Sequence, residues 1–355
     1  MTVAAAPVSG DTTVRGTPLI ELAGVTRTFK TPAGVITAVD NVSLALGQGE
    51  AMCIVGESGC GKTTTGRMLA GLLQPSSGRL MFEGANVWET KGAKLAAFRR
   101  AVQLVHQDPY ASLNPIRTVY QTLSAPLFKH HKARRGRDAK ARVIELLERV
   151  GLTPPLDFLV KYPHQLSGGQ RQRVAIARAL TVDPRVIVAD EAVSMVDVSI
   201  RISLLNLLLG LAREFNVTVV LITHDLAVAR FFARGGRIGV MYLGKVVELA
   251  GTDTLVEDPA HPYSAALIAA IPEADPNITR GKVRVELKSA DTPSLLALPP
   301  GCVFHPRCPL AEPGLCNVKV PVLEAIPGRE QERREVACHV AQRERAPAAE
   351  LLGVR

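Results

Sequence analysis

Residues 51–63, AMCIVGESGCGKT, join five apolar residues to a glycine-rich loop. The apolar run lacks polar alternation, which is typical of a strand buried on both faces of a parallel sheet. Residues 64–73, TTGRMLAGLL, continue as a helix, so the loop lies between a strand and a helix. In the pattern Gly-x-x-x-x-Gly-Lys-Thr, the glycines allow backbone N–H groups to surround phosphates. The stretch therefore predicts an α/β fold that binds a nucleotide.

The loop supplies most of the predicted nucleotide-binding residues. Lys62 neutralises the outer phosphates, and the Thr63 hydroxyl is a ligand for Mg²⁺. Cys60 is interpreted as a small filling residue rather than a redox centre. The predicted set in the loop is Gly56, Glu57, Ser58, Gly59, Cys60, Gly61, Lys62, Thr63 and Thr64.

Two further strand-like runs end in side chains that suit phosphate chemistry. VIVAD (186–190) is followed by Glu191, and VTVVLIT (217–223) is followed by His224. Asp190 at the strand end can bind Mg²⁺ directly or through water, and Glu191 can polarise the water that attacks the γ-phosphate. His224 is predicted to reach that phosphate. An acidic turn and a structural histidine are the ordinary alternatives for these residues taken singly.

Two residues outside those runs complete the predicted site. Gln107 ends VQLVHQ and can contact both Mg²⁺ and the attacking water. Phe29, in VTRTFK, suits stacking on adenine, but an aromatic residue in an early strand can equally belong to the core. The predicted catalytic residues are thus Glu191, His224 and Gln107, and the predicted Mg²⁺ ligands are Thr63, Gln107 and Asp190.

A second glycine pair raises the question of a second phosphate site. Residues 165–180, QLSGGQRQRVAIARAL, place the pair at the start of a basic helix, where exposed N–H groups suit an anion. The predicted anion-binding residues are Ser167, Gly168, Gly169 and Gln170. Because the first loop is complete by itself, this second group requires a separate explanation.

Composition limits the remaining possibilities. The chain has 355 residues, 47% apolar and 21% charged, which allows one large domain with an extension or two domains. Residues 1–18 are predicted to be a flexible tail without the features of a cleaved signal, and no apolar run approaches the length of a membrane span.

The net charge of +9 is densest in residues 129–142. No aromatic residues interleave with these cations for base stacking, so no nucleic-acid partner is predicted. The segment is interpreted as a solvated helix face with its leading loop, and an anionic partner such as lipid headgroups is the alternative.

Helical periodicity marks residues 109–180, between the strand-like runs. RDAKARVIELLERVG (137–151) places Val143, Leu146, Leu147 and Val150 on one face, with charges opposite. After residues 261–272 the periodicity fades into a segment rich in Pro, Glu and Arg.

Taken in order, the phosphate loop, Gln107, LSGGQ, Asp190–Glu191, SMVD and His224 resemble an ABC-transporter ATPase over residues 19–272. The resemblance implies a P-loop NTPase with a RecA-like core, an antiparallel β subdomain and a helical signature subdomain at about 109–180, followed by an extension at 273–355. It also implies that ATP and Mg²⁺ bind between two cassettes. Ser167 to Gln170 then contact the nucleotide of a partner, and Asp197 lies in the D-loop at the seam.

A narrower resemblance, to the ATPase subunits of dipeptide and oligopeptide importers, comes from QDPYASLNP, VMYLGKVVE and DPAHPYSAALIAAIP. It implies an identical or different second ATPase subunit, two membrane permeases and an extracellular solute-binding protein, with the chain peripheral at the cytoplasmic face of the membrane. The alternatives are a nickel or glutathione importer, or a soluble ABC ATPase acting on nucleic acid or the ribosome. Ala192 and Met195-Val196 depart from the Pro and Ala-Leu usual in the family, but Glu191 and His224 predict activity.

The late cysteines Cys302, Cys308, Cys316 and Cys338 form a separate group. A reducing compartment argues against disulfides, and the lack of Cys-x-x-Cys pairs argues against a Cys₄ zinc site, although His305 and His339 keep a mixed zinc site open. Unrelated thiols are a further alternative. Loose spacing of soft thiolates suits an iron–sulfur cluster, and the resemblance to the importer extension implies a [4Fe–4S] cluster on these four residues.

Overall fold

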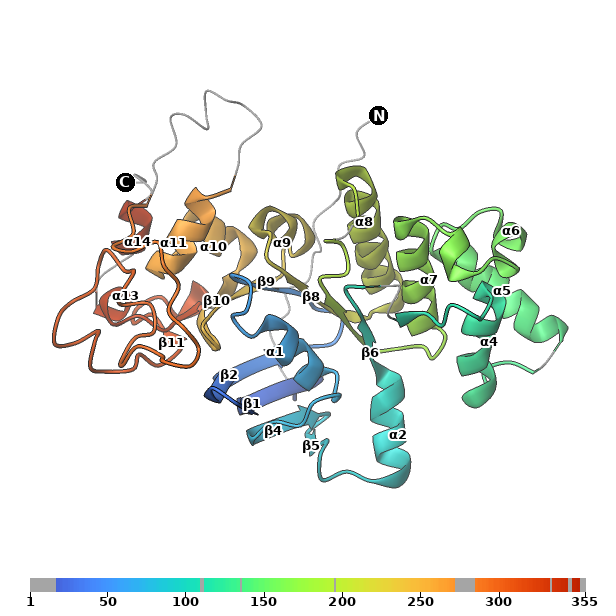
Figure 1. The fold of residues 1–355 in the computed structure, drawn as a ribbon, viewed down its shortest axis with the longest axis horizontal. Coiled ribbons are helices and arrows are strands. Elements are labelled where there is room, and N and C mark those ends of the chain that lie inside the picture. The colour runs from blue at the N-terminus through green and yellow to red at the C-terminus, as the bar shows by residue number, and fades with distance from the viewer. Residues whose placement is uncertain are drawn as a thin grey trace.

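The computed structural model describes residues 17–108, 112–134, 136–194, 196–271, 285–332, 334–343 and 347–351. Most of the predicted tail, residues 1–18, lies outside this description, as do the predicted boundary at 272–273 and the start of the predicted helical subdomain at 109. Figure 1 shows an α/β core with a helical part at one end and the C-terminal segment at the other.

The main sheet of the described residues has eight strands in the order β11-β12-β10-β9-β3-β8-β7-β6. Five of them run parallel from β9 to β6, and β10, β12 and β11 continue the sheet antiparallel. The parallel strands are β9 (Arg237–Tyr242), β3 (Ala51–Val55), β8 (Thr218–Thr223), β7 (Val186–Asp190) and β6 (Val102–Val105). The predicted strands at 51–55, 102–106, 186–190 and 217–223 are confirmed to within one residue at their ends.

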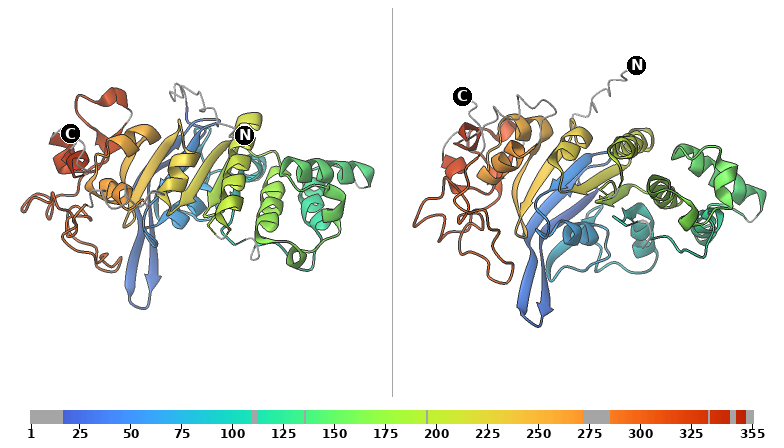
Figure 2. Two further views of the ribbon diagram at one scale, coloured as in Figure 1. Left: turned by 90° about the horizontal axis from the view of Figure 1, so that it is seen from above. Right: turned by 45° about the horizontal axis from the view of Figure 1, so that its top comes forward.

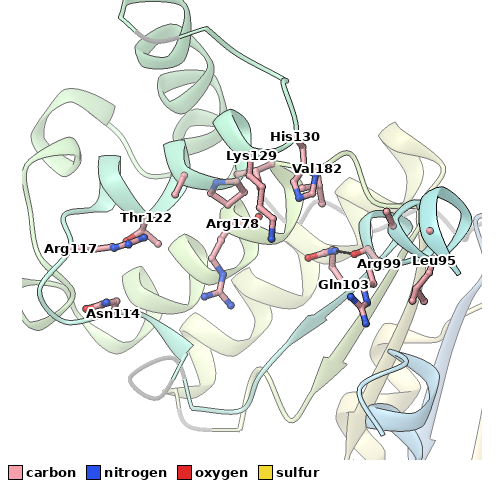
Figure 3. A pocket seen from close by; sticks show the side chains of 15 residues that line it. Leu95, Arg99, Gln103, Asn114, Arg117, Thr122, Lys129, His130, Arg178 and Val182 are labelled. Carbon is pink, nitrogen blue, oxygen red and sulfur yellow. Dashed lines mark hydrogen bonds between the residues drawn. The ribbon is translucent and has the colours of Figure 1, made fainter. Parts of the chain in front are cut away.

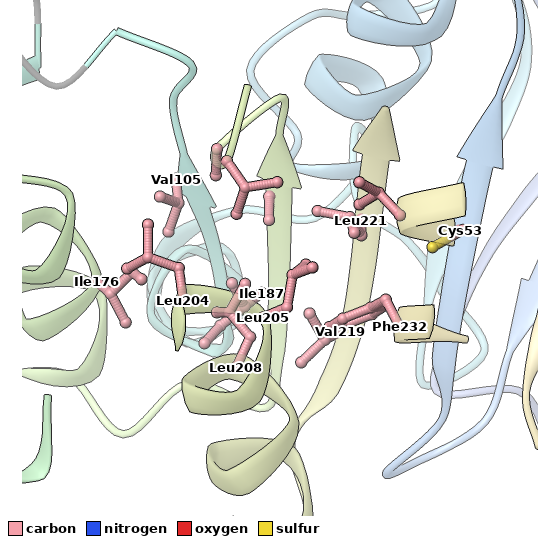
Figure 4. Close-up of a cluster of buried hydrophobic side chains, with 14 of the residues drawn as sticks. Cys53, Val105, Ile176, Ile187, Leu204, Leu205, Leu208, Val219, Leu221 and Phe232 are labelled. Carbon is pink, nitrogen blue, oxygen red and sulfur yellow. The ribbon is translucent and has the colours of Figure 1, made fainter. Parts of the chain in front are cut away.

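Both faces of this sheet are covered, which explains the absence of polar alternation. Cys53, Ile187 and Leu221 face a core shared with three helices, α7 (Gly168–Leu180), α8 (Val198–Phe215) and α9 (Leu226–Phe232), as Figure 4 shows. The residues one position along each strand belong to a second core with α1 (Lys62–Leu69). Successive strand side chains point to opposite faces, so each strand supplies both cores.

A separate antiparallel sheet lies against the second core (Figure 1). Its order is β2-β1-β4-β5, with bounds β1 (Ile20–Thr31), β2 (Gly34–Leu46), β4 (Ser77–Phe82) and β5 (Ala85–Asn86). The helix α2 (Gly92–Ala101) then leads into β6. This sheet confirms the antiparallel subdomain implied by the resemblance.

The helical part consists of α4 (Val119–Lys129), α5 (Arg137–Arg149), α6 (Pro155–Leu159), the 3₁₀ turn η1 (Pro163–Gln165) and α7. Val143, Leu146 and Leu147 of α5 and the following Val150 are all buried, as the helical periodicity predicts. Figure 2 shows that this part projects from the core.

The C-terminal segment adds to the sheet edge instead of forming a wholly separate layer. The strands β11 (Glu324–Ala325) and β12 (Glu335–Val336) extend the sheet from β10 (Lys245–Gly251). Two residues are too few to leave an alternating pattern, so the sequence did not predict these strands. The remaining helical elements are α10 (Thr252–Glu257), α11 (Pro262–Ala269), η2 (Glu330–Glu332), α13 (His339–Arg343) and α14 (Pro347–Glu350). None of the helices in the described ranges combines the length and apolarity that a membrane span requires.

Candidate nucleotide-binding site

The glycine-rich loop lies at the carboxyl end of β3 and leads into α1. Two of its glycines are required sterically. A Cβ at Gly56 would lie 2.1 Å from the Met241 carbonyl oxygen, and one at Gly61, whose φ is 104°, would lie 2.2 Å from the Ala38 oxygen. The loop backbone can pack this closely against the neighbouring strands only because these two positions carry no side chain.

Lys62 is held across the loop. Its Nζ donates to the carbonyl oxygens of Gly56 and Glu57, both at 2.8 Å, and the residue is buried. Cys60 beside it is 3% exposed, and burial raises the pKa of its thiol. A protonated, buried thiol agrees with the interpretation of Cys60 as a filling residue.

Thr63 and Asp190 meet from two different elements. The Thr63 hydroxyl, in the first turn of α1, donates to Asp190 Oδ1 at the end of β7, at 3.0 Å. Burial raises the pKa of the Asp190 carboxyl, since water is largely excluded around it. A hydroxyl and a carboxylate side by side are hard oxygen donors that fit Mg²⁺, which would also offset the cost of the buried charge.

Two of the predicted catalytic residues, Gln107 and His224, contact the carboxylate of the third, Glu191. Gln107 Nε2 donates to Glu191 Oε2 at 2.8 Å, and His224 Nδ1 lies 3.4 Å from Glu191 Oε1. Glu191 has a φ of 46°, and its turn is held by a hydrogen bond from Ser194 Oγ to the Glu191 carbonyl at 2.8 Å. A left-handed conformation in a residue other than glycine is common at functional sites. The turn keeps this shape with Ala192 in place of the usual proline.

Phe29 lies on the antiparallel sheet, at 36% exposure. The alternative that placed Phe29 in the core is therefore wrong. The Arg27 guanidinium carbon lies 4.8 Å from its ring centroid, which covers part of one ring face.

The second glycine pair begins α7. Ser167 caps this helix in a capping box, in which its side chain accepts from Gln170 N at 3.3 Å and Gln170 Oε1 accepts from Ser167 N at 3.0 Å. Gly168 borders open space, whereas a Cβ at Gly169 would lie 2.6 Å from the Ile200 side chain. Because α7 packs with α4, α5, α8 and β6 while α1 packs with β7, β8, β1 and β2, the two glycine-rich segments belong to different parts of the cassette.

Asp197, assigned to the D-loop, is exposed and precedes α8. Its carbonyl accepts from Arg201 N at 2.8 Å, and the Arg201 side chain reaches Asp225 at 3.3 Å. Asp225 follows His224 directly, so one ion pair connects the D-loop helix to the histidine turn.

Four residues next to the loop were not predicted from the sequence. Arg307 and Thr292 of the C-terminal segment contact the Glu57 carboxylate, Tyr263 accepts a hydrogen bond from Glu57 N, and Tyr242 accepts one from Arg307. Tyr242 and Tyr263 lie in the quoted stretches VMYLGKVVE and DPAHPYSAALIAAIP, but all four residues are far from the loop along the chain, so no local signal connects them to it.

The four late cysteines line one small pocket, together with Phe304, His261, His305 and His339. All four are free thiols, and burial raises the pKa of Cys308 to about 12 and that of Cys338 to about 11. Within the described ranges, no three His, Cys, Asp or Glu side chains are arranged to hold a single metal ion. The four cysteines that the sequence grouped together therefore do line one pocket. Their side chains in that pocket are not arranged to bind a single metal ion.

A groove of about 870 Å³ separates α2 and β6 from α4 and the end of α7 (Figure 3). Its described lining includes four cations and no Asp or Glu; the cations are Arg99, Arg117, Lys129 and Arg178. Asn114, in the stretch QDPYASLNP, also lines it, while Gln107 of the same stretch is not part of the lining. A positive, hollowed surface of this size fits a helix or loop of a partner.

The phosphate loop, the carboxylates at the strand end and the helical part with its capped glycine pair define a P-loop ATP-binding cassette. Residues 39–194 match the ABC transporter family, and residues 247–316 match the oligopeptide/dipeptide transporter C-terminal region.

The chain is 45% identical over 321 residues to the probable peptide ABC transporter ATP-binding protein y4tS of Sinorhizobium fredii, covering 90% of this chain and 86% of that protein. It is 44% identical over 314 residues to the oligopeptide transport ATP-binding protein AppF of Bacillus subtilis, covering 88% and 92%. A dimeric post-hydrolysis structure of the ATP-binding cassette MJ0796 with ADP and Pi superimposes with a TM-score of 0.59 at 33% identity, covering 66% of this chain and 98% of that one.

The chain belongs to the ATP-binding proteins of ABC transporters, in the group with the oligopeptide/dipeptide C-terminal region. Its members are ATPases that drive transport. The resemblance and the fold class inferred from the sequence are thereby confirmed.

Proposed function

We propose that this chain is the ATP-hydrolysing subunit of a peptide importer. The observation that carries the proposal is one chain that joins the phosphate loop and its carboxylates to a C-terminal region typical of oligopeptide/dipeptide transporters. Both matched relatives are named for peptide transport, and the chain covers most of each of them. We assign the ATPase domain to residues 19–272, with its helical subdomain at about 109–180, and the extension to 273–355.

The proposed chemistry assigns one task to each side chain around Glu191. Lys62 binds the outer phosphates of ATP, and the oxygens of Thr63, Asp190 and Gln107 bind Mg²⁺, which supplies charge neutralisation when present. Glu191 orients and polarises the attacking water. The 3.4 Å contact between His224 and Glu191 supports a role for the histidine in holding that carboxylate near the γ-phosphate.

A second cassette completes the proposed site. The start of α7 is a helix end at which Ser167 is exposed and Gly168 borders open space, and there Ser167, Gly168, Gly169 and Gln170 can receive the γ-phosphate held by another subunit. The phosphate loop of one chain and the signature of the other then share each nucleotide, which explains why one chain carries two phosphate-binding segments. The partner is a second copy or a related chain.

The groove in Figure 3 is the proposed docking site for a cytoplasmic helix of a membrane permease. Its four cations predict an acidic group on the docking helix, because complementary charges across an interface set orientation and rate of association. Two permeases would hold a pair of cassettes at the cytoplasmic face of the membrane. An extracellular solute-binding protein would deliver the peptide.

The test is uptake by the complete transporter reconstituted in vesicles. We expect ATP-dependent accumulation of a labelled dipeptide or oligopeptide, and no accumulation of nickel or glutathione. Arg117→Glu should reduce permease capture and uptake about tenfold, since it places a like charge against the proposed acidic helix. Lys140→Glu, on the exposed side of α5, is the matched control and should keep uptake. Transport of nickel or glutathione alone, or salt-sensitive nucleic-acid binding without permease capture, would contradict the proposal.

We also propose that the pocket of four cysteines holds a [4Fe–4S] cluster. The proposal is supported by the donor set, since soft thiolates are the ligands such clusters require. A cluster binds its thiolates through four separate iron atoms, so it accommodates cysteines too widely spaced for one ion. His305 Nδ1 and His339 Nε2 each lie 2.9 Å from a backbone carbonyl oxygen, an arrangement that a zinc-ligating histidine also shows, so metal analysis decides between the cluster and a mixed zinc site.

Protein purified without oxygen should be brown, with iron and acid-labile sulfide in near-equal amounts. Cys316→Ser should bleach it, because one iron loses its ligand, whereas Cys53→Ser in β3 should leave the iron content unchanged. Metal analysis and visible absorption spectra provide the measurement. Stoichiometric zinc, or no metal at all, would overturn the cluster and leave the ATPase assignment in place.

A further inference from the structure

The phosphate loop carries a carboxylate of its own. Glu57 is the first residue after Gly56, so its charge lies in a loop that binds a polyanion. Its backbone is engaged within the cassette, because Glu57 O accepts from Lys62 Nζ at 2.8 Å and Glu57 N donates to the Tyr263 hydroxyl at 3.0 Å. An unpaired negative charge in this position opposes ATP binding.

Arg307 pairs with that carboxylate from the C-terminal segment. Its Nη1 lies 2.9 Å from Glu57 Oε1 and 3.1 Å from Oε2, and Thr292 Oγ1 donates to Oε2 at 3.1 Å. Figures 1 and 2 place this segment beside β10 and α11. The contact thus joins the end of the cassette that carries the cysteine pocket to the loop that binds phosphate.

The Arg307 guanidinium is held in place by the side chains around it. The Arg307 side chain is 8% exposed, and its central carbon lies 5.7 Å from the Tyr242 ring centroid and 5.9 Å from that of Phe304. Its Nη1 also donates to the Tyr242 hydroxyl at 3.4 Å. A buried cation held by two rings has few alternative positions, so it can set the position of Glu57.

Attachment of the C-terminal segment to the cassette does not by itself explain the ion pair between Arg307 and Glu57. Arg329 and Arg334 already anchor the C-terminal segment by binding Asp258 after α10, at 2.8 and 3.2 Å. Those two pairs lie on a different part of the cassette, since both join the segment to the residue that follows α10. Arg307 is distinguished by its partner, the one acidic side chain inside the phosphate loop.

We propose that Arg307 is a positioning residue for ATP, which neutralises Glu57 and holds the first turn of the phosphate loop in its binding conformation. The C-terminal segment is then part of the nucleotide site, and ATP affinity depends on its being folded against the cassette. Positive potential at the loop comes from Lys62 and the backbone N–H groups only while the Glu57 charge is balanced.

The charge balance predicts an order of affinities. Arg307→Gln leaves one negative charge beside the phosphates, Glu57→Gln leaves one positive charge, and the double variant restores neutrality. A fluorescent, non-hydrolysable ATP analogue bound to the full chain should therefore bind most tightly to Glu57→Gln. The parent and the double variant should bind about equally, and Arg307→Gln should bind roughly tenfold more weakly.

Arg329→Gln is the control for loss of a C-terminal ion pair away from the loop: the segment stays folded at the assay temperature, so this variant should bind the analogue like the parent, with a lower melting temperature. If Arg307 served only to fasten the segment through this ion pair, each single variant would already lose the pair, and the double variant would bind no better than Arg307→Gln. Parent-like affinity in Arg307→Gln, or no recovery in the double variant, would overturn the proposal. If Arg307→Gln fails to fold, Glu57→Gln alone decides, because unchanged or weaker binding contradicts the charge argument.

Discussion

Replacing Glu191 by Gln should leave ATP binding intact and lower hydrolysis by about 10²–10⁴-fold. The amide has the shape of the carboxylate and can still accept a hydrogen bond from Gln107, which now reaches Glu191 Oε2 at 2.8 Å. It cannot polarise the attacking water. Because ATP persists between two cassettes, the variant should also accumulate as a closed dimer. Phosphate release and size-exclusion chromatography with ATP measure the two effects.

Glu214→Gln is the matched control for this prediction. Glu214 is exposed near the end of α8, and the same change of charge there should leave hydrolysis unchanged. A Glu191→Gln protein that hydrolyses ATP at the parent rate would show that another group orients the water.

Ser167→Arg should bind ATP at its own phosphate loop yet lose about 100-fold in turnover of the assembled transporter. The new side chain occupies the space in front of α7 that the partner nucleotide requires. It also removes the cap, since Ser167 Oγ accepts from Gln170 N at 3.3 Å. Nucleotide affinity of the isolated chain and ATPase rate of the assembled transporter separate the two sites.

Ser167→Ala separates obstruction from loss of the cap. It should cost about 1 kcal/mol of helix stability but leave the space open, so turnover should fall far less than in Ser167→Arg. Full turnover in Ser167→Arg would mean that this signature faces a nucleotide that is not hydrolysed.

The sequence was sufficient for the parts of the protein whose structure is local. The loop between β3 and α1 could be recognised because every residue that shapes it lies within a short stretch. The buried face of α5 followed from helical spacing, and the parallel strands followed from apolar runs. Asp190, Glu191, Gln107 and His224 were also predictable, because parallel strands bring their carboxyl ends to one edge of a sheet.

Tertiary structure decided whatever depends on residues that meet across the chain. Phe29 could be core or surface until the antiparallel sheet placed it at 36% exposure. The short strands β11 and β12 are stabilised by pairing with the edge of β10, so their own residues carry little signal. The irregular spacing of the four late cysteines along the sequence could not show how closely they lie together around one pocket.

The contact between Arg307 and Glu57 is the clearest case, since 250 positions separate the two residues. In the sequence Glu57 is an unremarkable position in the loop pattern, and Arg307 is one of many cations near the C-terminus. Only packing of Tyr242 and Phe304 around the guanidinium brings the two charges together. A long-range ion pair has no periodicity or motif, because its partners are selected by the fold rather than by their neighbours in the chain.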